Sequence, residues 1–536
     1  MNAQRVLGQI ERYAEIIAGE TNIPGLSIAV TDRQETIGIY TYGFSDISAK
    51  SPVVSNTLFE IASIGKSFTA IVLLQLHEEG KLDLYEPVEK YLPWFKVQSR
   101  YQPITLHNLL GHTGGIIRGT EQAPYGLYDA WALRETETGF APCEHWHYSS
   151  IGYKTLGFLL EKLTGQSFNE LIQTRILVPL GMTDTHATTT FETRKNTAKG
   201  YCSLYDDRPE NCDHMLVPAM WSECTTGDGC QVSTVEDFAI FLRMLLNTGE
   251  GPHGRLITEE SYYCMAPLTH RTDIEQYGYA LVSYPVDGHV YLGHGGGNAG
   301  FSSHILADVD EGFGVVVLTN RRTESESVYR LAEYIMKVLH AEQTGAQVPL
   351  IPPSPQDCTL VNAAEYAGTY RSGDSMFEVT ADNGKLVFHM AGKATPMEPR
   401  GEDRFYIRHP DMDLFLLEFN RDRENVVEAF HGPQWFKSEQ YTGQVHFDYP
   451  VEWDSYTGHY RARNPELSNF RIIVRKGTLL FIYPSGDIEP LRTMENGLFC
   501  VGDDFSPETL RFDAICEGKA LRAVYSGCPY FRAYKK

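Results

Sequence analysis

Apolar and polar residues follow two patterns along the first two thirds of the chain. Short runs rich in β-branched and aromatic residues predict strands near both ends of this segment, at residues 26–30, 37–40, 289–292, 302–307 and 314–318. Apolar residues that recur every three or four positions predict amphipathic helices, at residues 6–17, 68–79, 153–163, 238–246 and 328–340. A sheet built from both ends of the segment, with a helical block inserted between its strands, accommodates this order.

The pattern changes after residue 345. Four prolines at 346–355 predict a semi-rigid linker, because proline cannot continue a helix or a central strand. Beyond the linker come short alternating strands and an internal repeat, in which residues 366–371 return ninety positions later as residues 456–461. Two similar modules of this kind predict two small, closed, lipocalin-like β-barrels. The predicted domains are a catalytic domain, a linker and two barrels, at residues 1–345, 346–357, 358–447 and 448–536.

Composition narrows the partners and the compartment. A chain of 536 residues is long enough for roughly two to four domains. Its net charge of −23 argues against nucleic acid and anionic membrane as partners, since both need a basic face, and it leaves homo-oligomerisation open. No apolar run approaches the length of a membrane span, and no signal peptide is visible. The ten cysteines show no C-x-x-C pair, which predicts reduced thiols in a cytoplasmic protein and no structural zinc site.

Ser63 and Lys66 form an S-x-x-K motif immediately before the predicted helix at 68–79. Residues three apart on a helix share nearly the same face, so an amine would lie within reach of a hydroxyl. That pairing is the minimum needed to make a serine nucleophilic at neutral pH. Taken alone, the motif more often marks a helix N-terminus with a capping serine and a solvated lysine.

Two further segments carry parts that a nucleophilic serine needs. Tyr148 lies in a polar, aromatic turn directly before a predicted helix, and a phenol beside a lysine can carry a proton between nucleophile and leaving group. Residues 293–298 read Gly-His-Gly-Gly-Gly-Asn after a strand, and glycines there let backbone N–H groups approach a developing oxyanion. Each segment also has a structural interpretation, as a packed aromatic residue or as a hairpin turn.

In order and spacing, the three segments together resemble the serine β-lactamase and penicillin-binding protein superfamily. The resemblance is closer to its class C-like branch, which includes D-aminopeptidases and esterases, and neighbouring phrases match at residues 59–63, 109–115 and 179–182. It covers most of residues 1–345 and implies an α+β fold, with an antiparallel sheet flanked by helices and an all-helical subdomain. A catalytic domain followed by two barrels is similar in plan to the three-domain D-aminopeptidases.

The resemblance also implies a role for each matched residue. Ser63 would be the acylated nucleophile, Lys66 its proton acceptor or electrostatic partner, and Tyr148 the shared general base and acid. Backbone N–H groups of Ser63 and Gly297 would form the oxyanion hole, and neither a metal nor another cofactor is needed. The residues expected to line the substrate are Ser150, His294, Gly295 and Gly296.

Two departures from the family pattern bear on the substrate. Ser150 stands where the family usually has asparagine, and a hydroxyl is shorter and has fewer donors for the amide of an acyl group. His294 stands where lysine is common, and a histidine of ordinary pKa is mostly neutral at pH 7, so it offers no fixed charge to a substrate carboxylate. These departures favour an aminopeptidase, amidase or esterase over a true β-lactamase or carboxypeptidase.

The leading prediction is therefore a D-stereospecific aminopeptidase or amidase that acts through an acyl-enzyme on small molecules or short peptides. A carboxylesterase or weak β-lactamase on the same site is one alternative, and a non-hydrolytic penicillin-binding-like sensor or ligand binder is another. In D-aminopeptidases the last barrel sends a loop towards the active site. Candidate loops here are residues 483–487 and 494–497, each with one acid that could pair with a substrate ammonium.

Overall fold

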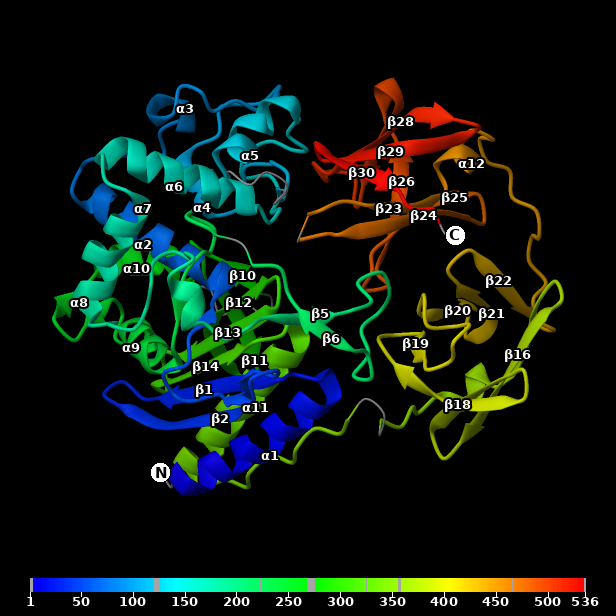
Figure 1. Ribbon diagram of the computed structural model, residues 1–536, viewed down its shortest axis with the longest axis horizontal. Coiled ribbons are helices and arrows are strands. Elements are labelled where there is room, and N and C mark those ends of the chain that lie inside the picture. Colours follow the sequence, from blue (N-terminus) through cyan, green and yellow to red (C-terminus); the bar gives the residue numbers. More distant parts are fainter. Residues whose placement is uncertain are drawn as a thin grey trace.

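The computed structural model describes residues 3–119, 126–221, 223–267, 275–323, 325–354, 358–464 and 466–534. An antiparallel sheet in the order β10-β11-β12-β13-β14-β1-β2-β3 forms the base of the N-terminal part (Figure 1). Because β1 pairs with β14, with Ile28 opposite Val317, the sheet joins the two ends of this part. Its strands are β1 (Gly25–Thr31), β2 (Thr36–Asp46), β3 (Ser51–Pro52), β10 (Gln276–Tyr277), β11 (Val282–Val286), β12 (His289–Asn298), β13 (Phe301–Asp308) and β14 (Phe313–Thr319).

Helices cover both faces of this sheet. On one face, α1 (Ala3–Thr21) packs beside α11 (Ser325–Thr344), and the predicted apolar stripe of α1 is buried there. The other face packs against α9 (Val235–Leu246) and a helical block. Since both faces are covered, every residue of β1 is buried. The block consists of α2 (Lys66–Glu78), α3 (Val88–Tyr91), α4 (Leu106–Leu110), α5 (Gly126–Ala132), α6 (Ser150–Thr164), α7 (Phe168–Ile172), α8 (Val178–Leu180) and α10 (Glu259–Met265).

The predicted α+β fold is confirmed, and the strands and helices expected before residue 345 have counterparts close to the predicted residues. The largest differences at a strand end are in β2 and β12, which each continue six residues past the predicted end. The extended part of β2 pairs with β1 and then with β3, and that of β12 pairs with β13. In the described part of the chain, no helix is both long enough and apolar enough to cross a membrane.

The C-terminal part contains two closed eight-stranded barrels. The repeated sequence opens each barrel in the same way: the Tyr370 hydroxyl donates to Tyr366 O at 2.9 Å, and the Tyr460 hydroxyl donates to Tyr456 O at 2.7 Å. Whether the barrels are separate domains with the expected boundaries stays a prediction. The strands of the first barrel are β15 (Gly368–Ser372), β16 (Ser375–Asp382), β17 (Lys385–Met390), β18 (Lys393–Pro399), β19 (Arg404–Ile407), β20 (Leu417–Asp422), β21 (Asn425–His431) and β22 (Gln434–Ser438).

The second barrel follows a short helix, α12 (Trp453–Tyr456), and repeats the same up-and-down strand order. Phenylalanine and tyrosine side chains fill its interior, among them Phe470 and Phe481, whose ring centroids lie 4.3 Å apart. Its strands are β23 (Gly458–Arg461), β24 (Asn469–Arg475), β25 (Thr478–Ile482), β26 (Ile488–Thr493), β27 (Leu498–Val501), β28 (Thr509–Cys516), β29 (Lys519–Tyr525) and β30 (Cys528–Arg532).

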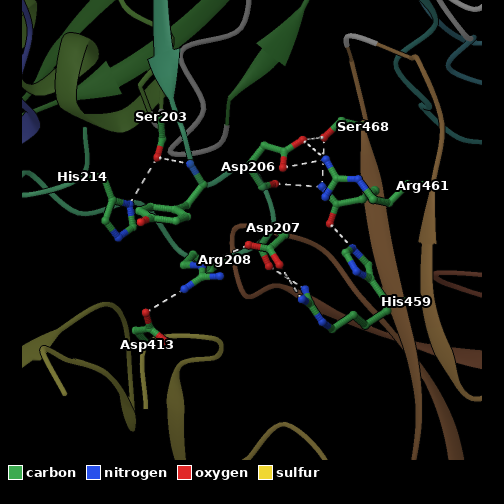
Figure 2. Close-up of polar contacts among 12 residues, drawn as sticks. Ser203, Asp206, Asp207, Arg208, His214, Asp413, His459, Arg461 and Ser468 are labelled. Carbon is green, nitrogen blue, oxygen red and sulfur yellow. Dashed lines mark hydrogen bonds and ion pairs between the residues drawn. The ribbon is translucent and has the colours of Figure 1, made fainter. Parts of the chain in front are cut away.

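One loop of the N-terminal part contacts both barrels. It connects β5 (Tyr201–Ser203) to β6 (Leu216–Pro218), and this hairpin projects from the sheet and helices towards the barrels (Figure 1). Figure 2 shows how consecutive charged residues of the loop reach partners on different barrels. The ion pairs are Asp206–Arg461 and Asp207–Arg471 with the second barrel and Arg208–Asp413 with the first.

Candidate active site

Ser63 lies in a 3-10 turn (Ala62–Gly65) that immediately precedes α2, rather than on the same continuous α-helix as Lys66. Ala62 takes a positive φ of 48°, which is uncommon for a residue with a side chain and turns the chain sharply before the serine. Lys66 is fully buried, and its Nζ donates to Ser63 Oγ at 3.0 Å and to Asp228 O at 2.7 Å. These two contacts hold the amine against the hydroxyl.

Glycines on both sides let neighbouring backbone approach this turn. Gly229 has a φ of 136°, and a Cβ there would lie 2.2 Å from Ala62 O. On the other side β12 passes beside the turn, and a Cβ on Gly296 would lie 2.2 Å from Ile61 O. A Cβ fits at neither position, so Gly296 allows β12 to pass close to the serine turn, and residues 293–298 lie within β12 rather than in a hairpin turn.

Tyr148 reaches the same place from the segment before α6. Its ring centroid lies 5.1 Å from Lys66 Nζ. The next residue, Ser149, is the N-cap of α6: it accepts from the Gly152 N–H at 3.1 Å and donates to Ile117 O at 2.8 Å. This cap fixes where the helix begins and therefore where the tyrosine leaves the backbone. Ser150, the first helical residue, is half-buried.

A chain of hydrogen bonds crosses from the tyrosine segment to β12. The Ser149 N–H donates to His112 Nδ1 at 3.1 Å, so a neutral His112 carries its proton on Nε2 and donates it to the Tyr277 hydroxyl at 3.1 Å. Tyr277 then donates to His294 Nε2 at 3.2 Å, and His294 Nδ1 donates to Gly295 O at 2.6 Å. Each group donates once along this chain, so the network is satisfied when both imidazoles are neutral.

Burial keeps these imidazoles neutral. It lowers the pKa of His112 well below the ordinary value, and the nearby Lys66 ammonium lowers it further. Burial, again with a contribution from Lys66, lowers the pKa of His294 to about 4. Neither histidine therefore supplies a positive charge to a substrate at pH 7.

Two arginines that no motif predicted lie close to the site. The guanidinium carbon of Arg118 is 5.3 Å from the centroid of the Tyr148 ring. The guanidinium carbon of Arg322 is 3.8 Å from the position that a Cβ on Gly297 would take, and its Nη1 lies 3.8 Å from a carboxylate oxygen of Glu466. Permanent positive charge is therefore present beside Tyr148 and beside Gly297, although His294 provides none.

Glu508, in the second barrel, contacts the segments that carry Tyr148. Its Oε1 accepts from the Arg118 N–H at 2.6 Å and lies 3.1 Å from His147 Nε2, while its Oε2 accepts from the Ser526 hydroxyl. Burial alone would raise the pKa of this carboxyl, but the hydrogen bonds from His147, Arg118 and Ser526 lower it below its ordinary value. Beside it, Phe505 stacks on His145, with ring centroids 3.9 Å apart.

The loop between β27 and β28 therefore reaches the N-terminal part, as does Glu466 in the loop between β23 and β24. The two loops expected from their turn chemistry have other surroundings. Asp487 lies against the first barrel, where Arg404 Nη1 is 3.2 Å from its carboxylate. Glu495 is exposed in a 3-10 turn. The acid expected to pair with a substrate ammonium is consequently not supplied by Asp487.

A second buried carboxyl lies near the serine turn. Glu60 belongs to β4 (Phe59–Glu60), which pairs with β7 (Val232–Ser233), and only 7% of it is exposed. Burial raises its pKa to about 8, and the charge of the nearby Cys224 adds to this effect, although the Asn298 amide donates to its carboxyl. Glu60 is thus largely protonated at pH 7.

The part of the chain that contains this site matches a known protein family. A family model described as beta-lactamase matches residues 10–340, which is more than half of the chain and spans the sheet, the helical block and the site. The chain belongs to the beta-lactamase family. The predicted superfamily is therefore confirmed, and members of this family are generally serine hydrolases.

Relatives of this beta-lactamase family member include penicillin-binding proteins. It is 26% identical to penicillin-binding protein 4* of Bacillus subtilis over 397 residues, which cover 69% of this chain and 84% of that protein. It is 28% identical to protein flp of Staphylococcus aureus over 336 residues, covering 61% of this chain and 65% of flp, so it spans just under two thirds of flp.

Two solved structures are similar to this family member. One is an octameric penicillin-binding protein homologue from Pyrococcus abyssi, with a TM-score of 0.58 and 25% identity, covering 81% of this chain and all of the other. The second is a beta-lactamase/D-alanine carboxypeptidase from Pseudomonas syringae, with a TM-score of 0.53 and 21% identity, covering 62% of this chain and 98% of the other. The second likeness shows the fold alone.

Proposed function

We propose that the protein is a serine hydrolase that acts through an acyl-enzyme, with Ser63 as the nucleophile. The observation that carries the proposal is the contact of 3.0 Å between the buried Lys66 Nζ and Ser63 Oγ. Asp228 O holds the same amine, and the Tyr148 ring lies 5.1 Å from it. An amine and a phenol beside one hydroxyl provide both a proton acceptor and a proton carrier.

The proposed reaction has two halves. Ser63 Oγ attacks the substrate carbonyl while Tyr148, supported by Lys66, accepts the hydroxyl proton and passes it to the leaving amine or alcohol. Backbone N–H groups of Ser63 and Gly297 stabilise the oxyanion of each tetrahedral intermediate. Water then attacks the acyl-enzyme by the reverse proton transfers and releases the acid.

For the substrate, we propose short amides of D-amino acids, as in a D-stereospecific aminopeptidase. The support is that His294 is neutral and Ser150 replaces an amide-binding residue, so the features that bind penicillin-like acyl groups are weakened. The second candidate is a carboxylate-bearing substrate, for a carboxypeptidase or weak β-lactamase. Arg118 and Arg322 favour this candidate, because a guanidinium pairs with a carboxylate through two hydrogen bonds.

A substrate panel tests both the proposed hydrolase activity and the proposed substrate class. The protein and its Ser63→Ala variant are incubated with D- and L-aminoacyl p-nitroanilides, p-nitrophenyl esters, nitrocefin and a peptide ending in D-Ala-D-Ala. Turnover of D-anilides alone supports the aminopeptidase, and turnover of nitrocefin or the carboxy-terminal peptide supports the second candidate. Turnover of esters alone indicates a carboxylesterase. If no substrate is turned over and mass spectrometry finds no acyl adduct at Ser63, the hydrolase proposal is wrong.

We also propose that the protein assembles with copies of itself, on the basis of its likeness to the octameric homologue from Pyrococcus abyssi. Light scattering coupled to size-exclusion chromatography measures the mass directly. A mass that is a multiple of the 60.4 kDa chain supports the assembly, and a mass of one chain contradicts it.

A further inference from the structure

Three potential metal ligands from distant parts of the chain meet at one edge of the N-terminal part. His289 is the first residue of β12, Asp308 is the last residue of β13, and His340 lies in the second half of α11. Figure 1 shows α11 running against this sheet on the side opposite the helical block. Within the described residues, each of the three offers one ligand atom, and these atoms lie within 4.8 Å of one another.

The two imidazoles converge on a single carboxylate oxygen. Asp308 Oδ2 lies 3.1 Å from His289 Nδ1 and 3.0 Å from His340 Nε2. Ligands bound about 2.1 Å from one metal ion, at angles between octahedral and tetrahedral, stand about 3.0–3.4 Å apart. The two contacts with Asp308 therefore suit a shared ion. The His289 and His340 rings stack with centroids 4.0 Å apart and planes 17° apart, so one ring must turn about its side-chain bonds before both nitrogens face the ion.

The surroundings of the carboxylate indicate that this arrangement is more than a pair of hydrogen bonds. His340 Nε2 is buried and makes no hydrogen bond of acceptable geometry to any described residue, although Asp308 Oδ2 is only 3.0 Å away. The other carboxylate oxygen accepts from the Glu311 N–H at 2.9 Å, which orients Oδ2 towards the imidazoles. A backbone contact of this kind is typical of the groups that support metal ligands.

We propose that His289, Asp308 and His340 bind one divalent transition-metal ion, with Zn²⁺ as the preferred ion. Two imidazoles and one carboxylate suit zinc, cobalt or nickel, whereas Mg²⁺ and Ca²⁺ prefer an all-oxygen set. The Asp308 side chain is 1% exposed and that of His289 is 33% exposed, so the ion enters past His289 and keeps water in its remaining positions. Cysteine spacing predicted no zinc site, and it could not reveal a set that contains no cysteine.

The site is remote from the proposed serine chemistry. His289 and Gly297 stand eight residues apart on β12, which is about 26 Å at roughly 3.3 Å per residue. The ion would join α11 to the ends of β12 and β13, so its role is structural. Binding therefore does not depend on the proposed function.

The test uses the full chain without a histidine tag, stripped with a chelator and dialysed. Titration with Co²⁺ should give one equivalent per chain with visible d–d absorption, and Zn²⁺ should displace it and raise the melting temperature. His289→Gln and His340→Gln should each weaken Co²⁺ binding by at least about 100-fold. His446→Gln, at an exposed histidine of the segment between the barrels, is the matched control and should bind as the wild type does.

Absence of Co²⁺ and Zn²⁺ binding by the wild-type protein overturns the proposal, and this result does not depend on how any variant folds. Undiminished binding by both ligand variants also overturns it, because the metal would then be held elsewhere. Turnover that depends on Ser63 is measured alongside, and the His340→Gln variant should retain it. A failure of metal binding is thereby distinguished from a failure of the proposed hydrolase.

Discussion

Truncation of one barrel side chain, Glu508→Ala, should reduce the activity of the proposed serine site in the other part of the molecule. Glu508 holds two residues beside Tyr148. It contacts His147, which precedes the tyrosine in sequence, and it accepts from the backbone N–H of Arg118, whose guanidinium lies over the tyrosine ring. Arg118 O in turn accepts from the N–H of Ser150 at 2.8 Å. Without the carboxylate, these segments lose their common partner, and the tyrosine is free to shift relative to Lys66.

The magnitude follows from the contacts that are lost. Hydrogen bonds to a charged group contribute about 1.5–3 kcal/mol each, and truncation of one partner of a buried charged pair costs about 2–5 kcal/mol in total. A displacement of about 1 Å at a reacting group lowers the rate by about 100-fold. We therefore expect kcat/KM to fall by about 30- to 300-fold, mainly through kcat, because the carboxylate is already engaged by protein groups.

The assay compares this variant with Glu508→Gln on whichever substrate the wild type turns over. The glutamine carbonyl can still accept from Arg118 and His147, and its amide can donate to the Ser526 hydroxyl, so placement is preserved while the charge is removed. We expect Glu508→Gln to remain within about 5-fold of the wild type. A folded Glu508→Ala protein with unchanged kcat/KM would refute the positioning role, and an equal loss in both variants would show that charge, rather than placement, is what matters.

Three other substitutions test separate features. Tyr277→Phe leaves His294 Nε2 without its donor and His112 Nε2–H without its acceptor, so kcat/KM should fall by about 10-fold and the melting temperature should also fall; unchanged kinetics would contradict the role of this network. Glu60→Gln should raise the free energy of unfolding by up to about 5 kcal/mol at pH 9 and hardly change it at pH 5. The pKa of Glu60 is raised to about 8 in the folded protein, so the wild type has a stability below pH 4.5 that it loses as the pH rises through about 8, whereas glutamine does not ionise. Equal urea midpoints at pH 9 would contradict this. Asp207→Asn weakens the contact with the buried Arg471, and the free energy of unfolding should fall by about 1–2 kcal/mol in urea titrations; no loss would mean that the pair is energetically neutral.

The parts of the fold that could be predicted are those whose cause is local in sequence. Runs of apolar and β-branched residues located β1, β13 and β14, which are buried on both faces, and the internal repeat located the two barrels. The 3-10 turn before α2 was not predictable, since its positive φ falls on Ala62. An alanine does not signal a positive φ in a sequence, whereas a glycine or an asparagine at that position would have suggested one.

Candidate site residues were predictable only where a motif contains them. Ser63, Lys66 and Tyr148 belong to recognisable segments, and the structure brings those segments together. The contact of Arg118 with Glu508 joins residues 390 positions apart and depends on how the second barrel is oriented, which no local pattern encodes. Turn chemistry identified loop tips at 483–487 and 494–497 correctly as turns, but it could not say what each tip faces.

The loop between β5 and β6 implies that the two barrels, although alike in sequence, are no longer interchangeable. Of its neighbouring residues, Asp207 pairs with a cation of the second barrel, Arg471, and Arg208 pairs with an anion of the first, Asp413 (Figure 2). Exchanging the barrels would remove Arg471 and Asp413 from these two residues. The two similar barrels therefore make different contacts with the same N-terminal part. A chimera of this protein should keep the order of the two barrels as well as their number.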